Sequence, residues 1–291
     1  MLERITFDTV DLHKCIAYDM HFHTEYSFDS KTPLNDVIKK AAKLGIHLAI
    51  TDHNVIAGNL KAQNNKYGVK VVPGIEVTFK ERRDLLFYFY KPADLERFYT
   101  QLIKPYLRQD SNMTSLSIVS FMESFDPKHF GCIVVAPHPF GRYYKNLHRI
   151  AGRFSRKSLA KITALEIFNS LEPSSNNYKA IRWAYEQKKQ VIGGSDGHVL
   201  DQLGMVVTYV KRRQHILDAI QEGNNYVSGR YTNYRTKTNI AEHMLRAKVD
   251  LNMQRARHTF NRVEQLTYSM STRISDRIIE ESRRMKERIL R

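Results

Sequence analysis

Cysteine and long apolar runs are both scarce in this sequence. Its 291 residues include only two cysteines, Cys15 and Cys132, too few for the disulfide framework of a small secreted scaffold. No uncharged apolar stretch is long enough to span a bilayer, and residues 1–5 do not begin a secretory leader. We therefore expect a cytoplasmic protein without a membrane segment. A chain of this length can bury a full hydrophobic core without crosslinks.

Acidic residues are few relative to basic ones. The 30 Asp and Glu stand against 46 Lys and Arg, which gives a formal net charge of +16. The surplus is concentrated in residues 142–161, with seven basic and no acidic residues, and in residues 231–291, with fourteen basic and seven acidic residues. Such local surpluses are either solvated surface or favour polyanionic partners such as nucleotides and nucleic acid.

Apolar runs rich in β-forming residues alternate with helical patterns over the first 230 residues. The expected strands are residues 16–20, 46–50, 69–72, 85–90, 132–136, 164–168, 191–193 and 205–210. This alternation is typical of an α/β fold with a parallel sheet or barrel.

Helix signals lie between these strands. Thr32 is in position to cap a helix that starts at Pro33 and stops at Gly45. Further helices are expected over residues 92–109, 177–189 and 213–222. Pro105 should kink or end the first of these three.

Residues 231–291 differ in composition from the rest of the chain. They contain neither Gly nor Pro, and their apolar positions recur about every 3.6 residues, which predicts one or two long amphipathic helices. Their apolar stripe would either pack on the fold as core or protrude as an arm for a protein partner or for self-association. We therefore divide the chain into a domain of residues 1–230 and a basic helical tail of residues 231–291.

Histidine and acidic side chains collect where the expected strands end. His21 and His23 are alternate residues of an extended segment, so both can face one ion. Four other strands are followed by further candidates: His53, Glu76, His138, Asp196 and His198. In a parallel α/β barrel these strand ends share the rim on which active sites are built. Imidazole and carboxylate are the natural ligands of Zn, Mn and Fe, so the sequence predicts a metal site at this rim.

The order of these motifs resembles a known family. The chain contains Asp-x-His-x-His, Thr-Asp-His, Gly-x-Glu, Pro-His-Pro and Gly-Ser-Asp-x-His in this order, as does the polymerase-and-histidinol-phosphatase (PHP) family of metal-dependent phosphoesterases. The resemblance covers roughly residues 16–230. It implies an α/β fold, a distorted (β/α)7 barrel of the PHP type, which holds two or three divalent metal ions.

The resemblance also implies a set of metal ligands in three groups. These are His21, His23, Asp196 and a bridging Glu76 for one ion; Asp29, His53 and His198 for a second; and Glu76, His138 and Asp84 for a third. The family usually has histidine where this sequence has Asp84. An oxygen ligand in place of nitrogen changes the metal preference of the third site.

The implied reaction is hydrolysis of a phosphate ester. Two divalent ions lower the pKa of a water to give hydroxide near neutral pH, and they neutralise the phosphate oxygens. The catalytic role of His21, His23, Glu76 and Asp196 would thus be exerted through this metal-activated water. No serine or cysteine nucleophile is then required.

Substrate contacts are expected from the basic segment that follows the Pro-His-Pro motif. Arg142 and Lys145 are the candidates for phosphate binding, and the interleaved Tyr143 and Tyr144 could stack on a base. Asn169, at the end of the sixth expected strand, is a further candidate for the rim, where it would contact substrate or only a loop.

These features leave several functions open. The leading hypothesis is a phosphoesterase that acts on a nucleotide or a nucleic-acid end, and the alternative is a small-molecule phosphomonoesterase of the histidinol-phosphatase type. Amidohydrolase barrels also begin with His-x-His, but Gly-Ile-Glu and Gly-Ser-Asp-Gly-His argue against that class. A non-catalytic metal-binding module, with a partner bound to residues 231–291, is the remaining possibility.

Overall fold

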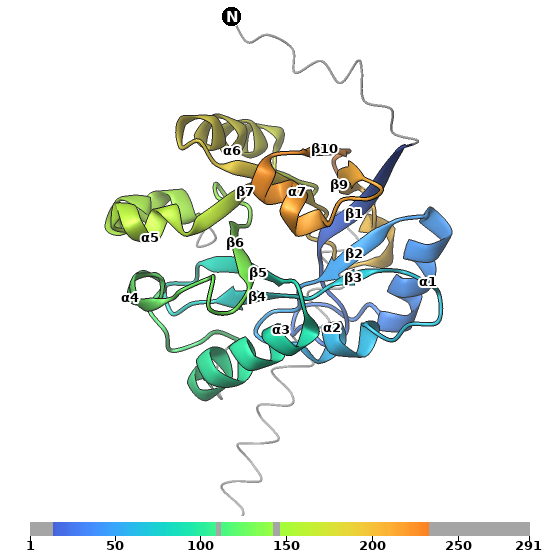
Figure 1. The fold of residues 1–291 in the computed structure, drawn as a ribbon, viewed down its shortest axis with the longest axis horizontal. Helices are drawn as coiled ribbons and strands as arrows, with labels where there is room; N and C mark the ends of the chain where they lie inside the picture. Colours follow the sequence, from blue (N-terminus) through green and yellow to red (C-terminus); the bar gives the residue numbers. More distant parts are fainter. Residues whose placement is uncertain (1–13, 109–111, 142–145, 233–291) are drawn as a thin grey trace, which may run out of the picture. The chain divides into compact units, whose positions relative to one another are not determined.

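The computed structural model describes residues 14–108, 112–141 and 146–232, and their strands form two sheets of five (Figure 1). The first sheet has the order β10 (Asn225–Gly229), β9 (Val206–Lys211), β1 (Cys15–Phe22), β2 (His47–Ile50) and β3 (Val71–Val72). The second has the order β4 (Gly74–Thr78), β5 (Asp84–Phe89), β6 (Cys132–Ala136), β7 (Ile162–Asn169) and β8 (Gln190–Gly194).

Both sheets mix parallel and antiparallel pairs. Parallel pairing joins β1 to β2, β2 to β3, β6 to β7 and β7 to β8, whereas β9, β10, β4 and β5 pair antiparallel with their neighbours. Two isolated parallel bridges, Phe22 with Gly197 and His53 with Glu76, connect one sheet to the other. The expected α/β class is confirmed, with two bridged sheets where a single seven-stranded barrel was expected.

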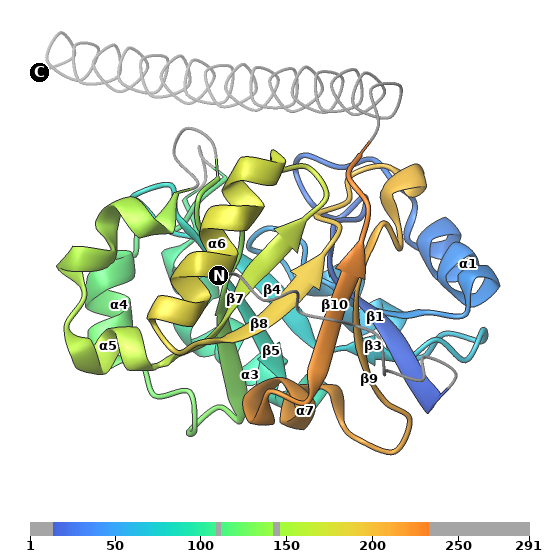
Figure 2. The same cartoon turned by 90° about the horizontal axis from the view of Figure 1, so that it is seen from above.

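Helices surround the strands in Figure 2. The α-helices are α1 (Leu34–Leu44), α2 (Ala57–Ala62), α3 (Pro92–Phe98), α4 (Ile118–Ser124), α5 (Arg156–Ala160), α6 (Ser174–Glu186) and α7 (Ile216–Glu222). A π-helical turn, Tyr99–Ile103, follows α3, and 3-10 turns cover Lys104–Tyr106, Leu147–Arg153 and Leu200–Gln202. None of the helices in the described part of the chain has the length and apolar character needed to cross a membrane.

Helix α1 shows how well the local signals work. Its buried face is formed by Leu34, Val37, Ile38 and Ala41, and it ends at Gly45 as expected, where a φ of 67° suits glycine. The expected cap by Thr32 is wrong. The helix begins after Pro33, and the Thr32 hydroxyl instead donates to the carbonyl of His198 at 2.7 Å, which ties this loop to the strand ends.

The inner faces of the two sheets enclose an apolar core. It contains side chains from both sheets, including Met20, Ala49, Leu86, Val135 and Ile192. Apolar residues of α7 join the same cluster and cover one end of it. Beyond the other end, toward the carboxyl ends of the parallel strands, the buried side chains are polar.

Several expectations fall on residues that the structure does not describe. Arg142, Lys145 and almost all of the tail lie outside the described residues, so the boundary at residue 230 stays a prediction. Two strands, β4 and β10, are additional to those expected. The expected helix over residues 92–109 is instead a series of α3, the π-helical turn and a 3-10 turn that contains Pro105.

Candidate metal centre

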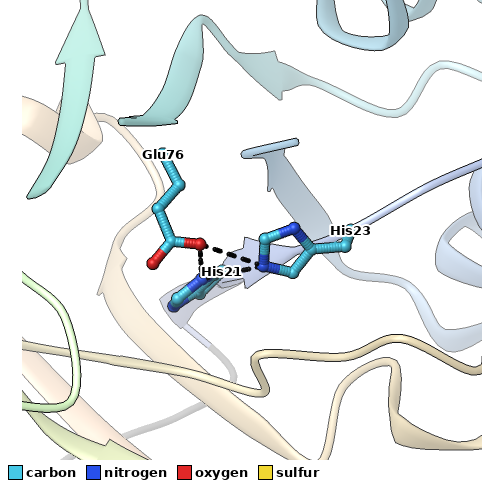
Figure 3. A group of neighbouring side chains, drawn as sticks. All are labelled: His21, His23 and Glu76. Atoms are coloured by element: carbon cyan, nitrogen blue, oxygen red, sulfur yellow. Dashed lines mark hydrogen bonds and ion pairs between the residues drawn. The ribbon is translucent and has the colours of Figure 1, made fainter. Parts of the chain in front are cut away.

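The carboxyl end of β1 places two histidines side by side. His21 and His23 are both fully buried, and their Nε2 atoms lie 3.1 Å apart. Glu76 projects from β4 toward them, and its Oε2 lies 3.2 Å from each Nε2 (Figure 3). The two histidines belong to the first sheet and Glu76 to the second, and the bridge between His53 and Glu76 connects the two sheets here.

Asp196 completes this group from the loop after β8. Its Oδ1 lies 3.3 Å from His21 Nε2 and 3.2 Å from His23 Nε2. Its backbone N–H donates to the His21 carbonyl at 2.8 Å, and its φ of 52° is unusual for a residue other than glycine. Gly194 makes this close approach possible, because a Cβ there would lie 2.4 Å from His21 Cβ.

The spacing of these four atoms suits a small cation. The two nitrogens and two oxygens are 3.1 to 3.3 Å apart in the pairs measured. The ligand atoms of His21, His23 and Glu76 all lie within 4.8 Å of one another, so these three side chains can contact a single ion. His21, His23 and Glu76 therefore fit a divalent metal ion in spacing and chemistry, and Asp196 Oδ1, within 3.3 Å of both nitrogens, is a further candidate ligand.

A second group lies on the other side of His23. Asp29 Oδ2 lies 3.1 Å from His198 Nε2 and 3.4 Å from His53 Nε2. The ring of His23 stacks against both imidazoles, with centroids 4.5 Å from His198 and 4.8 Å from His53. Ligand atoms of His23, Asp29 and His198 come within 4.8 Å of one another, so this trio can also hold an ion.

Asp84 joins a third group, but with different neighbours from those expected. Ligand atoms of Asp84 come within 4.8 Å of those of His53 and Glu76, whereas His138 Nε2 lies 3.3 Å from the other oxygen of Glu76. The Oδ1 atom of Asp84 is buried and has no hydrogen-bond partner among the described residues. A cation would satisfy this oxygen, and Glu76 belongs to two of the three groups.

Electrostatics at the cluster favour the binding of positive charge. Burial disfavours protonation of His21 and His23, but neighbouring carboxylates raise the pKa of His21 well above its usual value and that of His23 to about 10. Burial also opposes ionisation of Glu76 and Asp29, yet neighbouring imidazoles hold both pKa values well below the usual range. Ionised carboxylates in a buried site need cations, whether protons on histidine or metal ions.

Sequence reasoning missed one residue that supports this site, Glu166 on β7. It is fully buried, and its Oε1 lies 3.0 Å from His21 Nδ1. Its Oε2 accepts from the backbone N–H of His138 at 2.8 Å and from the side chain of Asn169 at 2.9 Å. A carboxylate on the distal nitrogen of a metal-binding histidine fixes the orientation of its ring. The available signal was a single acidic residue inside an otherwise apolar strand.

Asn169 lies deeper than a rim residue. Its side chain is fully buried, and its Nδ2 donates to Glu166 and, at 3.1 Å, to Asp196 Oδ2. Its Oδ1 accepts from the Leu171 N–H at 2.9 Å. The structure therefore places Asn169 between the supporting carboxylate of Glu166 and the candidate ligand Asp196, with its amide donating to both.

Two other acidic residues of the motifs support the backbone. Asp19 accepts from Ser195 Oγ at 2.6 Å and from the N–H of Gly204 at 2.9 Å, which ties β1 to the loop after β8. Asp52 accepts from both the N–H and the hydroxyl of Thr24, at 2.6 and 2.8 Å. Burial raises the pKa of each to about 6 against these hydrogen bonds. Both are connectors rather than members of the three ligand groups.

Comparisons with known proteins bear on the family and the fold of the chain. A family model described as PHP domain matches residues 19–228. A lesion-specific endonuclease from Pyrococcus furiosus has a similar structure, with a TM-score of 0.57 and 20% identity over 73% of this chain and 57% of that chain. A two-domain protein from Bacteroides vulgatus, containing a predicted PHP-like metal-dependent phosphoesterase, gives a TM-score of 0.52 and 15% identity over 74% and 65%. At these identities the similarity shows the fold.

A curated protein matches over a short segment. The probable histidinol-phosphatase of Thermotoga maritima is 50% identical over 36 residues, which is 12% of this chain and 16% of that protein. The chain thus covers less than two thirds of each of these three proteins.

Proposed function

Because this chain belongs to the PHP domain family, we propose that it is a metal-dependent phosphoesterase that hydrolyses phosphate esters of a nucleotide or a nucleic-acid end. The observation that carries this proposal is the buried group of His21, His23, Glu76 and Asp196, in which each nitrogen lies within 3.3 Å of both carboxylate oxygens. The two bridged sheets would correspond to the distorted barrel of the family.

The chain's own residues would divide the work as follows. Divalent ions, when bound, supply Lewis acidity and lower the pKa of water near the phosphate. Glu76 would bridge the groups, and His21, His23 and Asp196 would fix one ion. His53, His198 and Asp29 would fix a second, and Asp84 and His138, each near Glu76, would hold a third. Glu166 and Asn169 would hold the ligands in position.

A polyanionic substrate is supported by charge near the site. Burial lowers the pKa of Arg83, and the nearby positive charges of Arg149 and Arg153, both in the basic segment, lower it further. Arg83 directly precedes Asp84 in the chain, so these two arginines lie near the third ligand group. Both arginines are exposed. Together with Arg142 and Lys145, which we propose as phosphate contacts, they would present a cationic surface beside the metal groups. The similar structure from Pyrococcus furiosus is that of an endonuclease.

A small-molecule phosphomonoesterase is the second candidate. The specific observation in its favour is the 36-residue match to a probable histidinol-phosphatase. Salt dependence separates the two, because binding through many phosphate contacts weakens steeply with salt whereas binding of one phosphate does not. We also propose a cytoplasmic location, which the two free, buried cysteines support. A protein partner or a second copy of the chain would bind at residues 231–291.

Metal reconstitution tests the proposed function. Purified protein would be stripped with a chelator, reloaded with Mn, Zn or Fe, and assayed on mononucleotides, dinucleotides, single-stranded DNA and RNA, and histidinol phosphate. We expect activity to disappear on chelation and to return with at least one metal. Asp196→Ala should abolish activity and lower metal content, whereas Asp201→Ala, a matched change at a largely exposed aspartate, should alter neither. Full activity in the chelated protein, or normal metal content and rate in Asp196→Ala, would refute the proposal.

A further inference from the structure

A cavity of about 230 Å³ adjoins the candidate metal centre at His53. Its described lining residues are Tyr26, Phe28, His53, Asn54, Val55, Leu107, Arg108, Asn112 and Met113. A larger cavity of about 590 Å³ lies between α4 and the π-helical turn, but no candidate metal ligand lines it. The smaller cavity is therefore the candidate for substrate binding, because His53 belongs both to its wall and to the candidate metal centre.

Asn54, in the cavity wall next to His53, is fixed to β4, the strand that carries Glu76. Asn54 donates from Nδ2 to the Asn112 carbonyl at 2.9 Å, and its Oδ1 accepts from the Thr78 N–H at 2.9 Å. Its own N–H donates to the Glu76 carbonyl at 2.8 Å. Asn54 has a φ of 56°, a left-handed conformation that asparagine tolerates better than most residues. One strained residue thus sets the distance between the cavity wall and Glu76.

The chemistry of the lining favours a flat ring beside an anion. The Phe28 ring is 37% exposed and packs on the His53 imidazole, with centroids 5.1 Å apart. Tyr26 adds a second ring, and Arg108 adds a guanidinium, a group that pairs with phosphate or stacks on a base. None of the described lining residues is acidic. An exposed phenylalanine next to a metal ligand is an apolar surface that a planar ligand would cover.

The size of the cavity limits what can enter. Pockets for drug-sized ligands begin at about 300 Å³, so a cavity of 230 Å³ admits one ring system and little more. A stacked duplex does not fit, whereas the base of a mononucleotide or a single unpaired base at a strand end does.

We propose that this cavity is an aromatic-ring subsite, which holds the base of a nucleotide between Phe28 and Arg108 while its phosphate lies at the metal centre. This inference rests on the proposed function and names the part of the substrate that the protein selects. A free mononucleotide and the terminal nucleotide of a single strand present the same chemistry, and separate arms of the experiment distinguish them.

The kinetic arm compares substrates with and without a ring. On metal-loaded protein, KM is measured for AMP, for a short single-stranded oligonucleotide and for ribose 5-phosphate, which lacks the base. Stacking on an aromatic side chain predicts that Phe28→Ala raises KM for ring-bearing substrates about 5- to 100-fold, with KM for ribose 5-phosphate unchanged within about twofold. Phe28→Tyr should restore the wild-type KM. The substrate with the larger rise identifies the natural source of the ring.

The binding arm does not depend on hydrolysis. Saturation-transfer NMR with adenosine, which has no phosphate, should show contacts to the base in the wild-type protein and their loss in Phe28→Ala. Tyr185→Ala is the matched control, because Tyr185 is 87% exposed on α6 and does not line the cavity. Metal content is measured in each variant, since Phe28 precedes Asp29. If it falls in Phe28→Ala, Arg108→Gln replaces that variant and must raise KM for AMP.

The outcomes separate this inference from the proposed function. Equal KM values for AMP and ribose 5-phosphate in the wild type, unchanged by Phe28→Ala, overturn the ring subsite and leave the phosphoesterase intact. Adenosine binding that depends on Phe28, in a protein that hydrolyses no phosphate ester with any metal, supports the subsite and overturns the proposed function.

Discussion

The two faces of strand β5 bury side chains of opposite character. One face carries Asp84, Leu86 and Tyr88, of which Leu86 and Tyr88 belong to the core between the sheets and Asp84 to the metal centre. The other face carries Leu85, Phe87 and Phe89, which belong to a separate core under α3 and α4. The inner face of β5, which carries Asp84, thus joins core packing to a candidate metal ligand, whereas the outer face is entirely core.

The outer face is stabilised by aromatic packing. Phe98 of α3 lies at its centre, with ring centroids 4.8 Å from Phe87 and 5.1 Å from Phe89. Phe121, Phe125 and Phe130 surround the same ring at 5.6 to 6.4 Å. Rings at these separations gain from edge and offset contacts beyond the burial of their area.

The inner face of β5 adjoins the candidate metal centre, whose buried carboxylates oppose folding unless a cation is bound. Asp29, Glu76, Asp84 and Asp196 are almost fully buried, and removing ionised carboxylates from water costs several kcal/mol each unless a cation compensates. The comparison therefore predicts that the stability of the inner face depends on bound metal, whereas that of the outer face does not.

Substitution of the bridging carboxylate should produce the largest effect. Glu76→Gln keeps the shape of the side chain but removes the charge that faces His21, His23 and His53. We expect kcat/KM on a phosphate ester to fall about 10⁴-fold, which is above 5 kcal/mol. In the wild type, chelation should lower Tm by about 5 to 10 °C if the metal is held at 100 times its Kd. In Glu76→Gln the chelator should shift Tm little, and an equal shift in both proteins would contradict the bridging role.

Truncation on the outer face should affect stability alone. Phe98→Ala should lower the free energy of unfolding by about 3 to 5 kcal/mol, because it leaves a cavity among the rings. Chemical denaturation measures this loss, and metal content per folded molecule should stay at the wild-type value. If Phe98→Ala also loses metal per folded molecule, the aromatic core and the metal site depend on each other, and the proposed separation of the two faces of β5 is wrong.

Much of the inner face could be predicted because its ligands occur in short motifs at strand ends. His21, His23 and Asp196 were paired from spacing and family resemblance, and the structure brings them together. For Asp84 the predicted partners are Glu76 and His138, and the structure groups it with Glu76 and His53. The sequence predicts a strand over residues 69–72 that ends before Glu76, but residues 74–78 form a further strand, β4, which pairs antiparallel with β5 and sets which residues share a face.

Glu166 shows a second limit of sequence reasoning. One acidic residue in an apolar strand is compatible with an exposed edge, a bulge or a buried partner, and only the position of His21 on a distant strand decides among them. The missing information is the lateral order of strands. Local patterns do not encode that order, because it depends on contacts between residues far apart in the chain.

Removal of the Glu166 charge tests whether the metal site depends on carboxylates that do not themselves contact the metal. Glu166→Gln removes the negative charge behind His21 and should weaken metal binding about 10- to 100-fold, as is typical of outer-shell partners. Titration with a competing chelator measures this affinity directly. The matched control is Glu186→Gln on the exposed face of α6, which should leave it unchanged. Wild-type affinity in Glu166→Gln would mean that the carboxylate is only structural.

The smallest effect concerns a histidine outside the cluster. Carboxylates raise the pKa of His21, whereas burial, with a further contribution from Lys70, lowers the pKa of His47 below its usual 6.5. His47 Nδ1 accepts from the Lys70 N–H at 3.1 Å, which requires that nitrogen to be unprotonated.

The unfolded state therefore binds a proton at His47 at a higher pH than the folded state does. The contribution of His47 to stability is complete above pH 6.5 and is lost as the pH falls through its lower folded value. Because the ring is partly exposed, we expect this contribution to be below about 1 kcal/mol. Urea unfolding between pH 5 and 8 should show that wild type loses stability relative to His47→Gln on acidification. If the difference in unfolding free energy between wild type and His47→Gln stays constant with pH, burial does not lower the pKa of His47, and the contrast with His21 is wrong.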